Sequence, residues 1–106
     1  MAAIAQQTTH VQTEVRKPRL VFFHSALSGN CRRVEGFLAQ VLQRRRNHET
    51  FRLYNVAQEE RPDLLERFEV AKVPTLVVVE GKSVRARLES PRGCREIERF
   101  LGPWLH

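Results

Sequence analysis

The stretch that decides the fold is LVFFHSALSGNCRRVEGFL, residues 20–38. It opens with four consecutive apolar residues, which are typical of a short strand buried on both faces. The residues from Ser25 to Asn30 are mostly small and polar, with Gly29 as a breaker. From Cys31 onward apolar side chains recur at helical spacing. The stretch therefore predicts a buried strand, a loop and an amphipathic helix in succession.

The beginning and end of this helix have their own signals. Ser28 is a natural N-cap, because its hydroxyl can accept a backbone N–H of the first turn. The apolar period predicts a helix that runs to about Arg45. The basic run at residues 44–46 then falls at the helix end, where cations complement the negative end of the helix dipole.

The rest of the chain alternates between strand and helix signals. We expect a strand over residues 50–56, followed by a short helix that Pro62 opens and that buries Leu64, Leu65 and Phe68. Two further strands, over residues 75–79 and 83–88, should be joined by a turn at Gly81. The last helix should start near Pro91, break at residues 102–103 and align Cys94, Ile97, Leu101 and Trp104 on one face. In the second of those two strands Val84, Ala86 and Leu88 should face inward. The order β-α-β-α-β-β-α predicts an α/β fold with one mixed sheet and helices on both faces.

Composition narrows the class of protein. The chain has 106 residues, enough for one domain with a real core. Residues 1–17 are polar and lack either period, so we expect a flexible tail before a domain over residues 18–106. Because no apolar run is long enough to span a bilayer and the N-terminus has no secretion signal, we expect no membrane contact and a cytoplasmic location.

The net charge of the chain is positive, but its distribution does not indicate a nucleic-acid-binding protein. The formal net charge is +6, and fifteen of the eighteen basic residues are arginines spread along the chain and interleaved with acids. That pattern favours a solvated surface over a nucleic-acid binder, which would need aromatic interleaving or a recognition helix. The four histidines and two cysteines show no metal-ligand spacing, so we expect neither a metal nor another cofactor.

Residues 19–105 resemble the thioredoxin family. The loop Ser28-Gly29-Asn30-Cys31, between its strand and helix, is similar without a gap to the family's Cys-Gly-Pro-Cys motif. Val73-Pro74-Thr75 resembles the family's cis-proline motif, which also precedes an apolar strand and a glycine turn. The resemblance implies a three-layer sandwich and a redox lineage with protein substrates.

The departures from the family concern the chemistry itself. In the resemblance Ser28 occupies the position of the attacking cysteine and Cys31 that of the resolving cysteine. A serine hydroxyl is a far weaker acid than a thiol and needs a neighbouring base to act as a nucleophile. The family's buried Asp and its Lys partner align with Phe22 and Leu53, and the motif proline with Asn30. The resemblance therefore implies impaired or absent dithiol–disulfide exchange.

Two functions remain open. Cys31 as a single thiol would form mixed disulfides with a partner protein or glutathione, a weak monothiol activity, unless it is only a small core residue. Alternatively the chain is a non-catalytic module that binds peptides in a groove lined by Leu27, Gly29, Asn30, Val73 and Pro74.

Several residues at or near this site also have structural interpretations. Ser28 can be a helix cap alone, and His24 either a base for Ser28 or a solvated loop residue. Cys94 lies in register with the apolar face of the last helix, which favours a packing role. In the family's arrangement the starts of the two cysteine-bearing helices lie apart, so no Cys31–Cys94 disulfide is expected.

Overall fold

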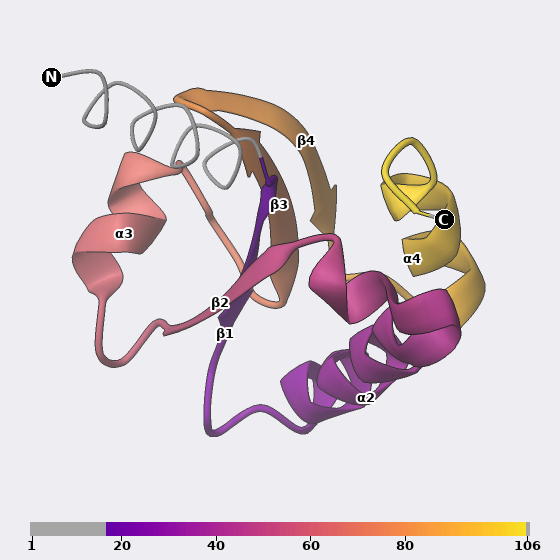
Figure 1. Ribbon diagram of the computed structural model, residues 1–106. Helices are drawn as coiled ribbons and strands as arrows, with labels where there is room; N and C mark the ends of the chain where they lie inside the picture. The colour runs from indigo at the N-terminus through magenta and orange to yellow at the C-terminus, as the bar shows by residue number, and fades with distance from the viewer. Residues whose placement is uncertain (1–16, 106) are drawn as a thin grey trace, which may run out of the picture.

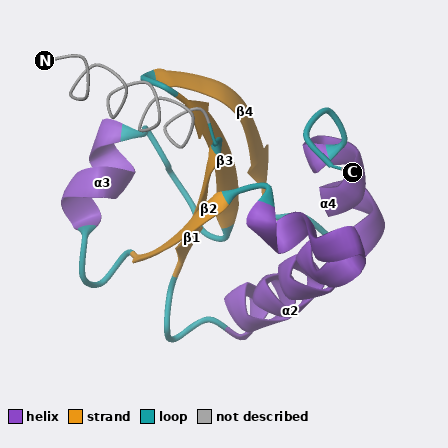
Figure 2. Ribbon diagram, in the orientation of Figure 1, coloured by secondary structure: helices purple, strands orange, loops and turns teal. Residues whose placement is uncertain are grey.

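A single four-stranded sheet organises the computed structural model, which describes residues 17–105. Residues 1–16 of the predicted tail, which spans residues 1–17, lie outside the described residues. In chain order the elements are β1 (Arg19–His24), α2 (Gly29–Gln43), the 3-10 helix η1 (Arg44–Glu49), β2 (Arg52–Ala57), α3 (Pro62–Arg67), β3 (Thr75–Glu80), β4 (Ser83–Glu89) and α4 (Cys94–Leu101). Figure 2 shows these elements along the chain.

The strands lie in the order β2-β1-β3-β4. Strand β1 pairs in parallel with β2, through the α2 crossover, and antiparallel with β3. The turn at Gly81, which has a φ of 62°, makes β3 and β4 an antiparallel hairpin. The predicted mixed sheet is confirmed, with β1 and β3 as its two central strands.

Helices cover both faces of the sheet, so the molecule has three layers. Figure 1 shows α2 and α4 on one side of the strands and α3 on the other. Alternate side chains of β1 serve the two layers: Leu20 and Phe22 pack in the core beneath α2 and α4, whereas Val21 and Phe23 pack with the α3 side. The predicted sandwich architecture is confirmed.

Some boundaries differ from the sequence prediction for local reasons. Helix α2 ends at Gln43, because Arg45 and Arg46 adopt φ values of 52° and 59°, outside helical geometry. The buried Asn47 side chain donates to the Arg44 carbonyl at 2.8 Å and closes this turn. Strand β2 starts at Arg52 rather than at residue 50.

The start of the last helix also differs. Helix α4 begins at Cys94 rather than near Pro91. Ser90 has a φ of 47°, and Gly93 is fully extended, so residues 90–93 form a separate link between β4 and α4. The Ser90 N–H donates to the Pro74 carbonyl at 2.8 Å, which fixes this link against the segment before β3.

Two predicted burial patterns were wrong in part. The Val84 side chain is 48% exposed, because the pairing of β3 with β4 shifts register between Val78 and Val79. Helix α3 is short and no residue of it is fully buried, although Leu64 and Leu65 pack against the adjoining core.

Strand β4 also holds the segment that leads from α3 into β3. The Arg87 guanidinium donates to the backbone carbonyls of Phe68 and Glu69, the latter at 3.0 Å. The Thr75 hydroxyl donates to the Lys72 carbonyl at 2.8 Å. The segment is therefore anchored near each of its ends.

Among residues 17–105 no helix combines the length and apolar character needed to cross a bilayer.

Two valine-to-alanine changes test the observed packing of the hairpin. Val78 is fully buried between β1 and β4, so Val78→Ala should lower the free energy of unfolding by about 2–3 kcal/mol. Val84→Ala, on the exposed side of the register shift, should cost less than about 1 kcal/mol. Chemical denaturation of both variants measures the difference, and equal losses would contradict the observed register.

Candidate functional site

Ser28 caps the helix that carries the site. Its backbone is extended, with φ −103° and ψ 120°, and its hydroxyl accepts the Cys31 N–H at 3.2 Å. The Ser28 N–H in turn donates to the Ser25 carbonyl at 3.2 Å. The hydroxyl therefore performs the structural role that the sequence predicted.

Cys31 lies directly behind this cap and is buried. Only 2% of the residue is exposed, and its Sγ accepts the Ser25 N–H at 3.3 Å. Cys31 also forms part of the wall of a small hollow of about 210 Å³, together with Phe22, His24 and Arg32 among others. The sulfur therefore lies one layer below the surface, beside a hollow that opens to solvent.

The cis-proline segment leaves the sheet at the same end as the β1–α2 loop. Phe23 at the end of β1 lies opposite Thr75 at the start of β3, so the residues that follow the one and precede the other are neighbours. The Val73–Pro74 peptide bond is cis, with Val73 half-buried and Pro74 buried. The hollow beside Cys31 is lined by neither of them.

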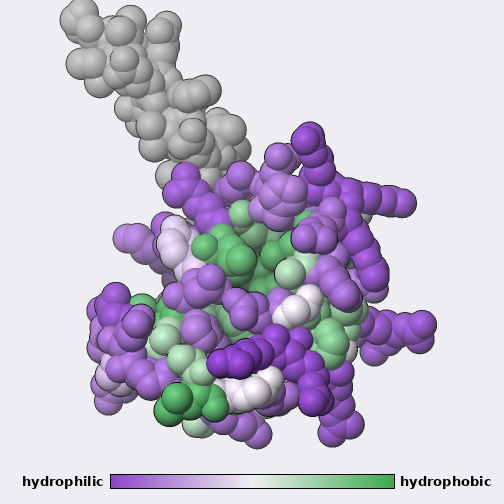
Figure 3. Space-filling view, turned by 90° about the horizontal axis from the view of Figure 1, so that it is seen from below, coloured by the Kyte–Doolittle hydropathy of each residue, from purple (hydrophilic) through white to green (hydrophobic). Residues whose placement is uncertain are grey.

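The remaining predicted binding residues are at the surface. Leu27 is 88% exposed at the tip of the β1–α2 loop, and Gly29 and Asn30 are exposed on the first turn of α2. In the space-filling view from below, apolar side chains gather near the centre and along one edge of this end of the molecule, with hydrophilic ones around them (Figure 3). A single groove joining Leu27 to Val73 stays a prediction.

A polar cluster that the sequence did not reveal shapes the loop. The buried Ser25 hydroxyl donates to the Glu59 carboxylate and accepts the Leu27 N–H at 3.2 Å. The second carboxylate oxygen of Glu59 accepts the Ala26 N–H at 3.3 Å. Glu59 follows β2, and parallel strands end at the same edge of a sheet, which is the signal that would have placed it beside the loop after β1.

These contacts act on the charge of Glu59. The hydrogen bond from the Ser25 hydroxyl, followed by one from its own backbone N–H, lowers the pKa of the Glu59 carboxyl below its ordinary value. Since Ser25 also presents its backbone N–H to the Cys31 sulfur, Glu59 positions the loop that surrounds the thiol.

Phe22 and Leu53, which align with the family's Asp–Lys pair, do not form an apolar pair in its place. Phe22 is 1% exposed and stacks on the His24 ring, with centroids 5.1 Å apart. Its neighbour on β2 is Asn55, whereas Leu53 lies opposite Leu20 and is 45% exposed. Leu53 therefore does not supply the apolar partner of Phe22. His24 makes no hydrogen bond with Ser28.

The two cysteines are not bridged. Cys94 opens α4 and is half-buried, and its thiol donates to the Gln40 side-chain oxygen at 2.9 Å. It thus packs against α2, as its place in the helical pattern indicated. Within the described part of the chain, no group of three or more His, Cys, Asp or Glu side chains is arranged to hold a metal ion.

Known proteins share both the sequence pattern and the architecture. The family model for thioredoxin matches residues 2–102. The structure is similar to reduced desulfothioredoxin from Desulfovibrio vulgaris Hildenborough, at 25% identity with a TM-score of 0.71, covering 82% of this chain and 81% of that one. It is also similar to oxidized thioredoxin O2 from Arabidopsis thaliana, at 17% identity and a TM-score of 0.72, covering 88% and 79%. No curated protein matches the sequence.

Glu59→Gln tests the polar cluster through pH. A carboxyl whose pKa is lowered by folding stabilises the folded state above its ordinary pKa of 4.5, and this contribution is lost as the pH falls through the lowered value. The variant should be less stable than the parent at pH 7, and the gap should narrow below pH 4.5. Urea denaturation across this range measures it.

Glu60→Gln is the matched control for this experiment. Glu60 is an exposed neighbour whose side chain makes no hydrogen bond with residues 17–105. A gap between parent and Glu59→Gln that stays constant from neutral to acidic pH would show that the carboxylate does not hold the loop.

Proposed function

Because this chain belongs to the thioredoxin family, we propose that it is a thioredoxin-type redox protein that has lost dithiol–disulfide exchange at Ser28 and Cys31. One observation carries the proposal: the Ser28 hydroxyl occupies the helix-cap position and accepts the Cys31 N–H. No histidine, lysine or carboxylate of residues 17–105 makes a hydrogen bond to that hydroxyl, so none of these residues is placed to act as its base.

The chemistry of dithiol exchange explains why a serine in place of the attacking cysteine is enough to abolish the exchange cycle. An attacking thiolate forms a mixed disulfide with the substrate, and a second thiolate then displaces the reduced substrate. At this site Cys31 is the single sulfur, and Cys94 is engaged with α2 elsewhere. A complete cycle within one chain therefore lacks its first step.

A reaction through Cys31 alone remains available within this proposal. As a thiolate, Cys31 would attack one sulfur of oxidised glutathione, form a Cys31–glutathione disulfide and release the other half as glutathione thiolate. An external thiol would then have to regenerate Cys31. The 2% exposure of Cys31 predicts that the first step is slow in the folded protein. Free thiols in the folded chain fit a cytoplasmic location.

Peptide binding without chemistry is the second candidate function, and the unpaired backbone of Val73 favours it. Its N–H and C=O make no hydrogen bond with residues 17–105, at the point where the chain enters the central strand β3. An extended segment of a partner protein can pair with such groups as an added strand. Leu27, 88% exposed on the neighbouring loop, offers an apolar contact for the same segment.

The parent protein and Ser28→Cys together test the proposed loss of exchange. The parent should not accelerate the reduction of insulin by dithiothreitol above the uncatalysed rate. Ser28→Cys should recover a slow reductase activity, because the new thiol lies at a helix N-terminus one turn from Cys31. Recovery should be partial, since the apolar Phe22 cannot relay a proton to the resolving sulfur.

The control for this experiment is Ser28→Cys combined with Cys31→Ala, which should lose the recovered activity. Substantial insulin reduction by the parent would overturn the proposal. If Ser28→Cys supplied a reactive thiol that never formed a disulfide with Cys31, the equivalence of this loop with the family motif would be wrong.

Incubation with oxidised glutathione tests the single-thiol reaction. The folded protein should gain one glutathione quickly at the half-buried Cys94 and a second one slowly at Cys31, as followed by intact mass spectrometry. Cys94→Ala isolates the slow addition and Cys31→Ala removes it. If the Cys94→Ala protein gains no glutathione until it is denatured, Cys31 has only a packing role.

A further inference from the structure

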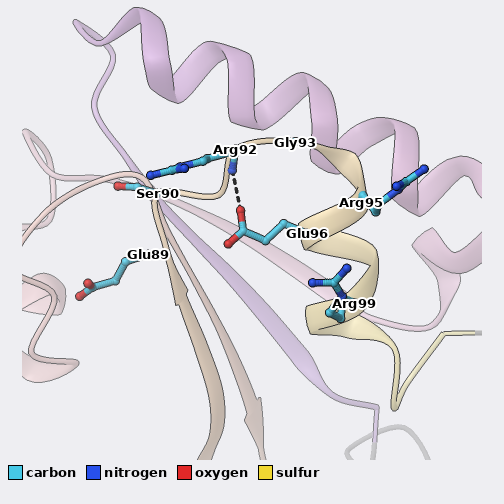
Figure 4. Close-up of a pocket in the computed structure, with 7 residues that line it drawn as sticks. All are labelled: Glu89, Ser90, Arg92, Gly93, Arg95, Glu96 and Arg99. Atoms are coloured by element: carbon cyan, nitrogen blue, oxygen red, sulfur yellow. Dashed lines mark hydrogen bonds between the residues drawn. The ribbon is translucent and has the colours of Figure 1, made fainter.

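A second, larger hollow lies between the end of β4 and the start of α4. Its volume is about 720 Å³, and it opens widely to solvent. Three arginines and two glutamates supply all its charged side chains: Arg92, Arg95, Arg99, Glu89 and Glu96. Figure 4 shows this hollow with its lining residues.

The arginine side chains here lack counterions among the residues that the structure describes. None of the three forms an ion pair or a side-chain hydrogen bond with any residue in the 17–105 range. Glu96 is already engaged, since its carboxylate accepts the Arg92 backbone N–H at 2.7 Å. Figure 4 shows the Arg92 side chain reaching toward Ser90 and that of Arg99 pointing toward Glu96. The Arg95 side chain points away from Ser90 and Arg92 (Figure 4), so Arg92 and Arg99 are the cations at the hollow. Cations without a partner among residues 17–105 raise the local concentration of anions.

The hollow adjoins the cis-proline segment. Ser90, which lines the hollow, donates its N–H to the Pro74 carbonyl at 2.8 Å. Glu89, also in the lining, lies opposite Thr75 in the hairpin. A polypeptide that pairs with the Val73 backbone and continues past Ser90 would therefore enter the hollow beside Arg92.

We propose that this hollow binds acidic side chains of an extended polypeptide segment laid along Val73, so that the protein selects acidic partners. The inference rests on the peptide-binding function proposed above and adds its specificity. A polypeptide is favoured over a nucleic acid because the lining contains no aromatic side chain on which a base could stack.

Peptides of equal length and different charge test the inference. The probes are three fluorescein-labelled peptides with the same central Ala-Val-Ser-Ala sequence, flanked by glutamates, glutamines or lysines, and binding is read by fluorescence anisotropy. The glutamate peptide should bind roughly fivefold more tightly than the glutamine peptide, the effect of two exposed arginine–carboxylate contacts. This preference should shrink as salt is added.

Two double variants of equal charge locate the effect. Arg92→Gln with Arg99→Gln should reduce the preference for glutamate to less than twofold and leave the glutamine peptide unaffected. Arg46→Gln with Arg67→Gln removes two exposed charges at other places and should keep the preference. Leu27→Ser tests the underlying peptide site and should weaken the binding of all three peptides equally.

Each result separates the two proposals. If the parent binds glutamate and glutamine peptides equally while Leu27→Ser weakens both, the acidic specificity is wrong and peptide binding stands. If no peptide binds, both are overturned. Tighter binding of a single-stranded oligodeoxynucleotide, lost in Arg92→Gln with Arg99→Gln, would assign the hollow to nucleic acid instead. If millimolar inorganic phosphate displaces the glutamate peptide, the hollow is a general anion site and the inference fails.

Discussion

The rest of the structure depends on strand β1 being buried on both faces. Leu20 and Phe22 face one helical layer and Val21 and Phe23 the other, so a polar residue at any of the four would enter a core. Because β1 is paired on both sides as well, its backbone is fixed along its length. The loop that follows starts from a rigid point, and that rigidity sets where Ser28 begins α2.

At Ser28 the requirement for starting the helix differs from the requirement for disulfide exchange. A helix cap requires a side-chain acceptor near the first-turn N–H groups, and the Ser28 hydroxyl meets that requirement at 3.2 Å. Disulfide exchange requires a sulfur at the same position. The fold can therefore persist after the nucleophile is gone, and a thioredoxin-like backbone alone says nothing about turnover.

Local patterns predicted the elements well and long-range placement poorly. Apolar runs and helical periodicity were enough for β1, α2, β3 and the order of the chain, because burial on known faces leaves a clear signal. They could not show that a register shift would expose Val84, since an alternating sequence pattern does not indicate where a β-bulge interrupts the pairing. The role of Glu59 could not be predicted for a different reason. It lies 34 residues from Ser25 in the sequence, and only the parallel pairing of β1 and β2 places it beside the loop.

Two of the anchors on the segment before β3 come from β4 and from the link that follows it. Arg87 holds the carbonyls of Phe68 and Glu69, and Ser90 holds that of Pro74. Edge strands are often the first part of a sheet to open in the native state, and hydrogen-bonded neighbours open with them as one cooperative unit. Local unfolding of β4 would therefore remove the contacts of Arg87 and Ser90 together and leave only the Thr75 contact with Lys72, so that amide hydrogen exchange in the edge strand and mobility of the cis-proline segment are coupled.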